Sequence, residues 1–328
     1  MSDPQAVFEA IRDEAGTVLI GNEDIVEGLA ISMLTGGHTL LEGVPGVAKT
    51  TIANLFARTT GLDYQRIQMT PDVLPADITG THIYRENIGQ FELQRGPVFA
   101  NLVLADEINR ATPKTQSALL EAMQEGTVTI EGDTLQLPKP FMVVATQNPI
   151  EQEGTFELPE AQRDRFQLKY IVDLPERADE REILERFDSN PGLGPDAVEQ
   201  TVSLDDLLAA REIVSDVYVD EKVYEYILDI VSATRDSELI EHGASPRASL
   251  AFLNAGKARA AIHGREFVTP DDIKALAPNV LIHRLILGTE AELSGRSRKE
   301  IVSEILDTVS LPQHEIDAEE TASVDSVQ

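Results

Sequence analysis

The chain contains 328 residues, with 57 acidic side chains against 27 basic ones, so its formal net charge is −30. Cysteine is absent, which excludes disulfides, thiolate zinc sites and cysteine nucleophiles. The length predicts about two domains, and since no apolar run approaches the ~18 residues of a membrane span, we expect a cytoplasmic protein that does not contact a membrane.

The excess of acidic over basic residues indicates which environment and which partners suit this protein. Carboxylates repel one another at physiological salt and are almost fully screened at molar salt, where the Debye length is about 3 Å. The composition leaves two interpretations open, a protein of a high-salt (halophilic) cytoplasm and an ordinary acidic protein. Nucleic acid is disfavoured as a partner, because a phosphate backbone requires a basic footprint that this composition does not provide.

Short apolar runs alternate with helical patterns in the first half of the chain, which is typical of an α/β fold with a parallel sheet. The predicted strands are residues 38–42, 65–69, 102–106, 141–146 and 167–172. Those at 102–106 and 141–146 are almost continuously apolar, as buried parallel strands are. Two alternating segments, about 81–93 and 127–137, predict hairpins that project from the sheet.

Helical patterns take over after Pro175. The predicted helices are residues 176–188, 203–216, 220–235, 246–263, 270–277 and 297–308. The last residues, 313–328, are polar and acidic, as disordered tails are. We therefore expect an α/β domain over 1–175, a smaller all-α domain over 176–312 and a disordered acidic tail over 313–328.

A glycine-rich segment joins the first predicted strand to a helical run, as in phosphate-binding loops. It consists of Gly43, Val44, Pro45, Gly46, Val47, Ala48, Lys49 and Thr50, and Thr51 follows it. Its backbone amides can surround a β-phosphate, Lys49 can neutralise β- and γ-oxygens, and the Thr50 hydroxyl can bind Mg²⁺. Ala48 stands where the general motif has glycine, so its Cβ must fit at the turn. This fit is feasible if the φ of Ala48 is negative. A glycine-rich turn without a ligand is the alternative.

Polar residues follow two of the apolar strands. Asp106 and Glu107 end the run at 102–106, at the edge of the sheet where ligands bind in doubly wound folds. Asp106 is the candidate Mg²⁺ ligand, through water, and Glu107 the candidate base that deprotonates the attacking water. Asn148 follows the strand at 141–146 and is placed to contact a γ-phosphate. The alternatives are solvated carboxylates that open a loop and an ordinary Asn-Pro turn. Together these residues predict a site for ATP and Mg²⁺.

The motifs GVPGVAKT, LVLADEINRA, TQNP, LPEAQRDRF and GASPRASL occur in this order, and as a set they resemble the MoxR family of AAA+ ATPases. The resemblance covers roughly residues 15–310, and the alanine before Lys49 is common in that family. It implies a P-loop αβα sandwich with a parallel sheet, followed by a smaller helical lid. It also implies a homo-oligomeric ring, expected to be a hexamer, with ATP sites between subunits and with the 81–93 hairpin as the helix-2 insert.

Two arginines gain a role from the resemblance. Arg165 matches the arginine finger, which reaches into the neighbouring subunit's site, and Arg163 is the runner-up because it lies two residues away. Arg247 matches the lid arginine called sensor 2, whose contact with nucleotide would couple hydrolysis to movement of the lid. Surface arginines in salt bridges with nearby carboxylates are the alternative for Arg163 and Arg165.

The resulting expectation is a Mg²⁺-dependent ATPase that remodels or matures protein partners, which the resemblance suggests include proteins with von Willebrand factor A domains. The rival enzyme is the motor subunit of a chelatase. A nucleic-acid motor would need basic hairpin tips, whereas the tips at 86–89 and 131–133 carry acidic residues. A nucleotide-gated scaffold with little turnover is a third class, against which the presence of Glu107 and Asn148 argues.

Overall fold

The computed structural model describes residues 3–87, 89–149 and 154–311, so the predicted tail lies outside the described residues. A five-stranded parallel sheet forms the centre of the fold, in the order β2-β5-β8-β1-β9. Its strands are β1 (Thr39–Glu42), β2 (Tyr64–Gln68), β5 (Leu102–Asp106), β8 (Met142–Gln147) and β9 (Leu168–Ile171). Each lies within one residue of a predicted strand at either end. The α/β prediction is therefore confirmed.

Helices cover both faces of this sheet. They are α1 (Pro4–Gly16), α2 (Glu23–Thr35), α3 (Lys49–Thr60), α4 (Pro75–Thr79), the 3-10 turn η1 (Ile108–Arg110), α5 (Pro113–Glu125) and α6 (Glu160–Arg163). Side chains alternate between the faces along β5, as they must in a strand. Leu102 and Leu104 join the hydrophobic cluster that contains α1, α2 and α3, whereas Val103 and Ala105 join the cluster that contains α5. The result is the αβα sandwich that the family resemblance implies.

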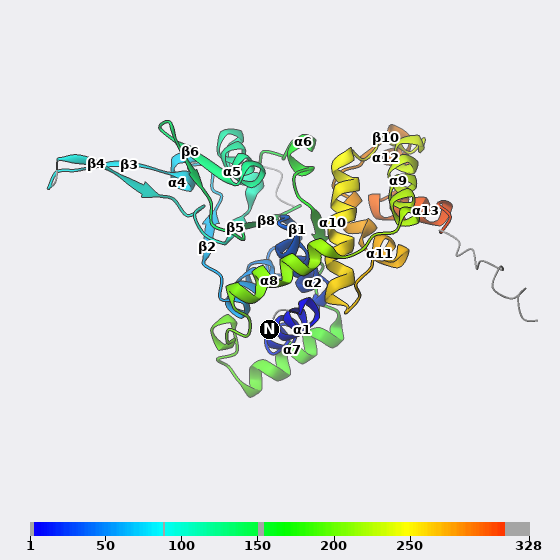
Figure 1. Ribbon diagram of the computed structural model, residues 1–328, viewed down its shortest axis with the longest axis horizontal. Helices are drawn as coiled ribbons and strands as arrows, with labels where there is room; N and C mark the ends of the chain where they lie inside the picture. Colours follow the sequence, from blue (N-terminus) through cyan, green and yellow to red (C-terminus); the bar gives the residue numbers. More distant parts are fainter. Residues whose placement is uncertain (1–2, 88, 150–153, 312–328) are drawn as a thin grey trace, which may run out of the picture.

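Both predicted hairpins are present. Strands β3 (Gly80–Arg85) and β4 (Gln90–Arg95) pair antiparallel and extend away from the body of the molecule (Figure 1). Strands β6 (Thr127–Ile130) and β7 (Asp133–Gln136) are joined by Glu131 and Gly132, with φ of 50° and 102°. Positive φ at both positions is typical of the tight turns whose twist matches that of the strands.

The second half of the chain is helical, which confirms the predicted lid. Its elements are α7 (Arg177–Ser189), η2 (Pro195–Ala197), α8 (Leu204–Asp216), α9 (Glu221–Asp236), β10 (Ile240–His242), α10 (Pro246–Ile262), α11 (Pro270–Leu281), β11 (Ile286–Leu287), α12 (Thr289–Leu293) and α13 (Arg298–Thr308). Two differences from the prediction stand out. Strands β10 and β11 form a short antiparallel pair, and α11 continues past Pro278 because the completely buried Val280 and Leu281 belong to the core.

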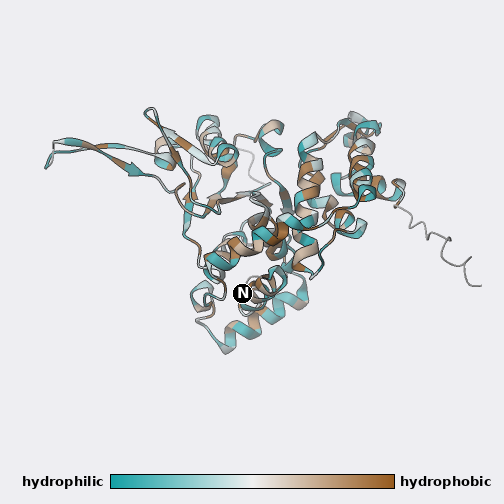
Figure 2. Cartoon of the chain, viewed as in Figure 1, coloured by the Kyte–Doolittle hydropathy of each residue, from teal (hydrophilic) through white to brown (hydrophobic). Residues whose placement is uncertain are grey.

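One hydrophobic cluster joins the N-terminal helices to the lid. It contains Phe8 of α1, Leu29 of α2, Leu207 of α8 and Phe252 of α10, and Figure 2 shows hydrophobic residues around α2 and along α10. The core is thus continuous across residue 175, and the boundary placed there stays a prediction. Among the described residues, no helix is both long enough and apolar enough to cross a bilayer.

Candidate functional site

The glycine-rich segment leads from the end of β1 into α3 and leaves the start of that helix open to an anion. Ala48 is the residue that caps α3, its side chain makes no capping hydrogen bond, and the first turn holds no acidic residue. The first amides of a helix carry partial positive charge and lack partners within the helix. At Gly46, φ is +89° and an added Cβ would meet no atom within 4 Å. The loop therefore presents amides toward open space, as a phosphate requires.

The conformation of Ala48 differs from the sequence-based expectation. Its φ is +63° and its ψ is 14°, in the left-handed region, so the negative φ under which an alanine would fit without strain is not the one adopted. The chain turns into α3 through two positive-φ residues, Gly46 and Ala48, and successive amides in such a turn form an anion-binding concavity. An alanine in this region costs roughly 1–2 kcal/mol. The glycine-rich loop therefore adopts this conformation at some expense to stability.

Lys49 and Thr50 lie near the carboxylates at the end of β5. The Lys49 amine donates hydrogen bonds to the carbonyl oxygens of Gly43 and Val44, at 2.8 Å for Val44. Burial lowers the pKa of Lys49, and the nearby Asp106 and Glu107 oppose that shift. Thr50 Oγ1 donates to Asp106 Oδ2 at 3.3 Å. The predicted metal-binding hydroxyl and carboxylate are thus neighbours.

Asp106 is 6% exposed and both of its carboxylate oxygens are held. Thr146 Oγ1 donates to Oδ1 at 2.6 Å. Arg66 of β2 donates to Oδ2 from Nε at 3.0 Å and from Nη2 at 2.6 Å. Local sequence does not predict this contact of Arg66, because its proximity to Asp106 arises from the pairing of β2 with β5, in which Gln68 lies opposite Asp106.

Glu107 is fixed by its backbone and by its side chain. Its φ is 57°, and its amide donates to Thr146 Oγ1 at 2.8 Å. Its carboxylate accepts hydrogen bonds from Gln68 Nε2 and Arg110 Nη1, both at 3.0 Å. Since Arg66 Nη2 also donates to Gln68 Oε1 at 2.8 Å, a chain of polar contacts through β2 joins the two carboxylates. Gln68 is a second residue of the site that the sequence analysis missed.

These residues enclose one cavity of about 380 Å³. Its lining consists of Pro45, Gly46, Val47, Ala48, Lys49, Thr50, Thr51, Asp106, Glu107, Thr146, Gln147 and Asn148. Asn148 is 5% exposed and follows β8, which pairs with both β1 and β5. Hydroxyl and carboxylate oxygens are the protein ligands that Mg²⁺ takes beside phosphates, and the amides and Lys49 suit the phosphates. The residues therefore fit a Mg²⁺ nucleotide.

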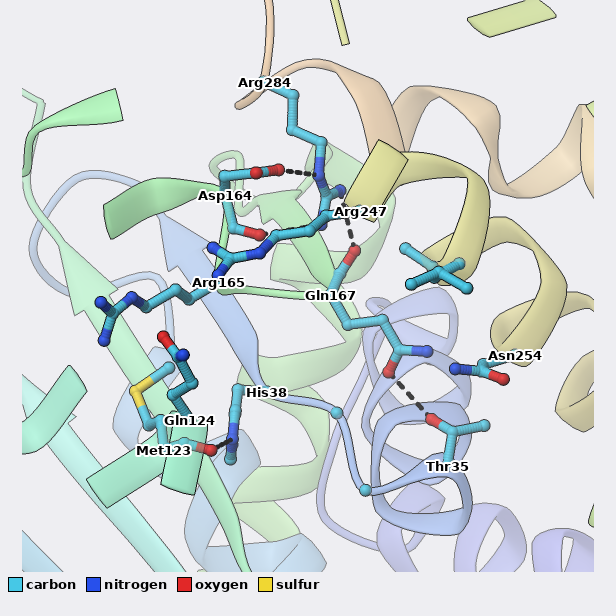
Figure 3. Close-up of a pocket in the computed structure, with 14 residues that line it drawn as sticks. Thr35, His38, Met123, Gln124, Asp164, Arg165, Gln167, Arg247, Asn254 and Arg284 are labelled. Atoms are coloured by element: carbon cyan, nitrogen blue, oxygen red, sulfur yellow. Dashed lines mark hydrogen bonds and ion pairs between the residues drawn. The ribbon is translucent and has the colours of Figure 1, made fainter. Parts of the chain in front are cut away.

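The two candidate arginines lie elsewhere, together in a second cavity of about 230 Å³ (Figure 3). Arg165 donates from Nη1 to the Leu120 carbonyl at 2.7 Å, and Arg247 is exposed at the start of α10. Arg163 does not line this cavity, nor the neighbouring one that Arg165 also borders. Arg165 and Arg247 thus line the same cavity, and neither lines the cavity around Lys49.

Comparisons with known proteins identify families and relatives that this chain resembles. The model of the ATPase family associated with various cellular activities (AAA) matches residues 38–168, and that of the AAA lid domain matches residues 232–305. Chaperone MoxR1 of Mycobacterium tuberculosis is 45% identical, over 94% of this chain and 82% of its own length. The uncharacterised protein YeaC of Bacillus subtilis is 45% identical, over 90% and 92%. A crystal structure of a provisionally assigned ATPase from Cytophaga hutchinsonii superposes with a TM-score of 0.87 and 44% identity, covering 94% of this chain and 96% of that one.

Proposed function

The chain belongs to the MoxR family of AAA+ ATPases, and from this premise we propose that it is a Mg²⁺-dependent ATP hydrolase that acts as a ring of identical subunits on protein partners. We expect six subunits in the ring and a cytoplasmic location. One observation carries the proposal: the phosphate-binding residues and the two arginines line separate cavities of the same chain.

The first cavity binds the triphosphate. The amides from Gly46 to Thr51 and the Lys49 amine hold the phosphates, and Lys49 exchanges its carbonyl partners for phosphate oxygens. Thr50, and Asp106 through water, would hold Mg²⁺, which would supply positive charge to neutralise the phosphates. Arg66 orients Asp106, because two hydrogen bonds from its guanidinium fix the position of the carboxylate.

The chain's own groups then assist attack by water. Glu107 accepts a proton from the water as its oxygen bonds to the γ-phosphorus, and the bond from that phosphorus to the oxygen bridging the β- and γ-phosphates breaks, which gives ADP and phosphate. Asn148 donates from its amide to a γ-phosphate oxygen. Glu107 is already oriented by Gln68 and Arg110, so little rearrangement is needed before the proton moves.

The second cavity completes the site of the neighbouring subunit. Arg165 and Arg247 supply positive charge where negative charge develops on the transferred phosphoryl group. Because both arginines lie outside the cavity around their own Lys49, each ATP is held between two subunits. A head-to-tail contact of this kind generates a ring when its rotation closes.

The client is proposed to be a protein, and proteins with von Willebrand factor A domains are the expected class. A relative 45% identical to this chain is named a chaperone. The projecting hairpin exposes a cross-strand aromatic pair, Tyr84 at 52% and Phe91 at 71%, with ring centroids 5.3 Å apart. Its Arg85 is paired with Glu92 at 2.9 Å. An exposed aromatic pair beside a turn that carries the acidic Glu86 suits a protein surface better than a phosphate backbone.

Mixing two inactive variants tests the composite site. We expect Lys49→Ala and Arg165→Ala each to abolish turnover, and a 1:1 mixture to regain up to about a quarter of it, because that share of interfaces pairs an intact Lys49 with an intact Arg165. Turnover is measured in molar KCl, which screens the acidic surface, after subunit exchange is verified. No recovery in verified mixed rings would reject the composite site.

A further inference from the structure

Asp164 connects the segment that carries Arg165 to the lid. Its carboxylate accepts a hydrogen bond from Arg284 Nε to Oδ1 and one from Ser245 Oγ to Oδ2, both at 2.8 Å. Arg284 follows α11, and Ser245 directly precedes α10. Both oxygens of one carboxylate are therefore bound by residues of the lid, and Figure 3 shows Asp164 and Arg284 paired beside the cavity of Arg165 and Arg247.

Arg284 is built into the joint between the sheet and the lid. Its side chain is 2% exposed, and it donates to the carbonyl oxygens of Phe166 at 2.6 Å and Gln167 at 3.1 Å in addition to Asp164. Burial lowers its pKa and Asp164 opposes that shift. A buried guanidinium without its carboxylate is strongly unfavourable. Asp164 and Arg284 therefore hold each other in place.

Ser245 extends this joint to Arg247. Its hydroxyl oxygen accepts a hydrogen bond from the Arg247 amide at 3.1 Å, as a helix cap does, while its proton goes to Asp164. Asp164 directly precedes Arg165 in the chain. It is also connected to the Arg247 backbone through two successive hydrogen bonds, both of which involve the Ser245 hydroxyl. The two arginines thus share one support, although they come from different parts of the fold.

We propose that Asp164 and Arg284 are positioning residues that hold Arg165 and Arg247 as one unit, so that the nucleotide of the neighbouring subunit meets both arginines together. This inference rests on the proposed composite site. A lid that shifts α10 must carry Arg165 with it or break a buried ion pair. The Asp164–Arg284 pair consequently makes the arginine finger respond to the position of the lid.

Mixed rings test the direction in which Asp164 acts. Asp164→Asn keeps the shape and removes the charge, and misplacing the arginines should lower turnover roughly 10- to 100-fold. Mixed with Lys49→Ala subunits, which have intact arginines, it should regain turnover. Mixed with Arg165→Ala subunits it should not, because every interface then has a defective arginine side. Asp164→Asn should still bind a fluorescent ATP analogue, since Asp164 does not line the cavity around Lys49.

Controls separate positioning from general stability. Asp272→Asn removes the carboxylate of another lid ion pair, with Arg265 at 2.6 Å, and should leave turnover per folded ring near that of the unmodified protein. If Asp164→Asn does not fold, Ser245→Ala takes its place, because it removes the hydrogen bond from Ser245 to Asp164. Its control is Ser297→Ala, which deletes an equivalent cap on α13. Ser245→Ala should then lower turnover and Ser297→Ala should not.

Three results would overturn the inference. One is undiminished turnover of Asp164→Asn, or of Ser245→Ala where that variant replaces it. The second is recovery with Arg165→Ala, and the third is absence of recovery with Lys49→Ala while Lys49→Ala and Arg165→Ala still complement each other. Failure of that last pair would instead reject the composite site itself.

Discussion

Arg66 on β2 and Asp106 at the end of β5 form an ion pair at the same carboxylate oxygen that Thr50 approaches. The guanidinium donates to Oδ2 at 2.6 and 3.0 Å, and Thr50 Oγ1 lies 3.3 Å from that oxygen. In the proposed site Asp106 would hold Mg²⁺, so we expect a metal ion to compete with Arg66 for this carboxylate.

Replacing Arg66 by glutamine should therefore strengthen metal binding. An ion pair whose arginine is half exposed contributes about 1 kcal/mol, so we expect metal affinity to rise roughly 3- to 10-fold. Titration with Mn²⁺, followed by its electron paramagnetic resonance signal with ADP present, measures this directly. Arg85→Gln is the matched control, because Arg85 is equally exposed and paired with Glu92. Unchanged Mn²⁺ affinity in Arg66→Gln would show that the pair does not compete.

Replacing Glu107 by glutamine should separate binding from turnover. The amide keeps the shape and loses the ability to take a proton, so ATP hydrolysis should fall about 10²- to 10⁴-fold, whereas the affinity for ATP should stay within about twofold. Single-turnover hydrolysis and equilibrium binding of ATP provide the two measurements. Glu180→Gln on the exposed side of α7 serves as the control. Retained turnover in Glu107→Gln would remove it as the base.

Ala48→Gly should stabilise the fold, although glycine usually destabilises a helix. The left-handed φ of +63° costs alanine roughly 1–2 kcal/mol, and glycine removes this cost. The greater freedom of glycine in the unfolded chain offsets about 0.4–1 kcal/mol of that gain. We expect the free energy of unfolding to rise by up to about 1 kcal/mol. Ala53→Gly, in the buried middle of α3, should lower it by about 1 kcal/mol or more. Denaturant titration of both variants checks the opposite signs.

Acid should destabilise the protein through His38. Its neutral ring donates from Nε2 to the Met123 carbonyl and accepts from the Val143 amide at Nδ1, both at 3.0 Å, and burial lowers its pKa to about 4. As the pH falls, His38 is protonated in the unfolded chain before it is protonated in the folded protein. The contribution of the neutral His38 ring to the free energy of unfolding is therefore complete above pH 6.5 and is lost as the pH falls toward 4, at about 1.4 kcal/mol per pH unit.

His38→Gln should flatten this part of the stability profile, since glutamine can keep a donor and an acceptor but does not titrate. Free energies of unfolding measured at several pH values between 7 and 4 give the slope. His242→Gln, exposed on β10, is the control. Equal slopes for the His38→Gln variant and the unmodified protein would contradict the assignment.

Residues next to one another in the chain were the predictable part of the site. A run buried on both faces of a sheet must be apolar, so β5 was recognisable, and Asp106 and Glu107 follow from its end. The glycine-rich loop was likewise local. The fold class followed from the same alternation of strands and helices.

The support for these residues depends on pairings that local sequence does not encode. Arg66 reaches Asp106 through the register of β2 against β5, and Arg284 reaches Asp164 across 120 positions of the chain. An arginine on an edge strand and another after a helix are individually ordinary. The φ of Ala48 was also missed, because the amino acid at that position favours the opposite sign.

The continuous hydrophobic cluster through α1, α2, α8 and α10 determines how large the motions of a working subunit can be. Swinging the lid open as a hinged body would expose side chains such as Phe8 and Phe252, each at a cost of about 1.5–3 kcal/mol. Sliding of packed helices past one another keeps these side chains buried. In the proposed ring we therefore expect each subunit to move only a short distance, and large displacements of a client to be built up from the movements of successive subunits.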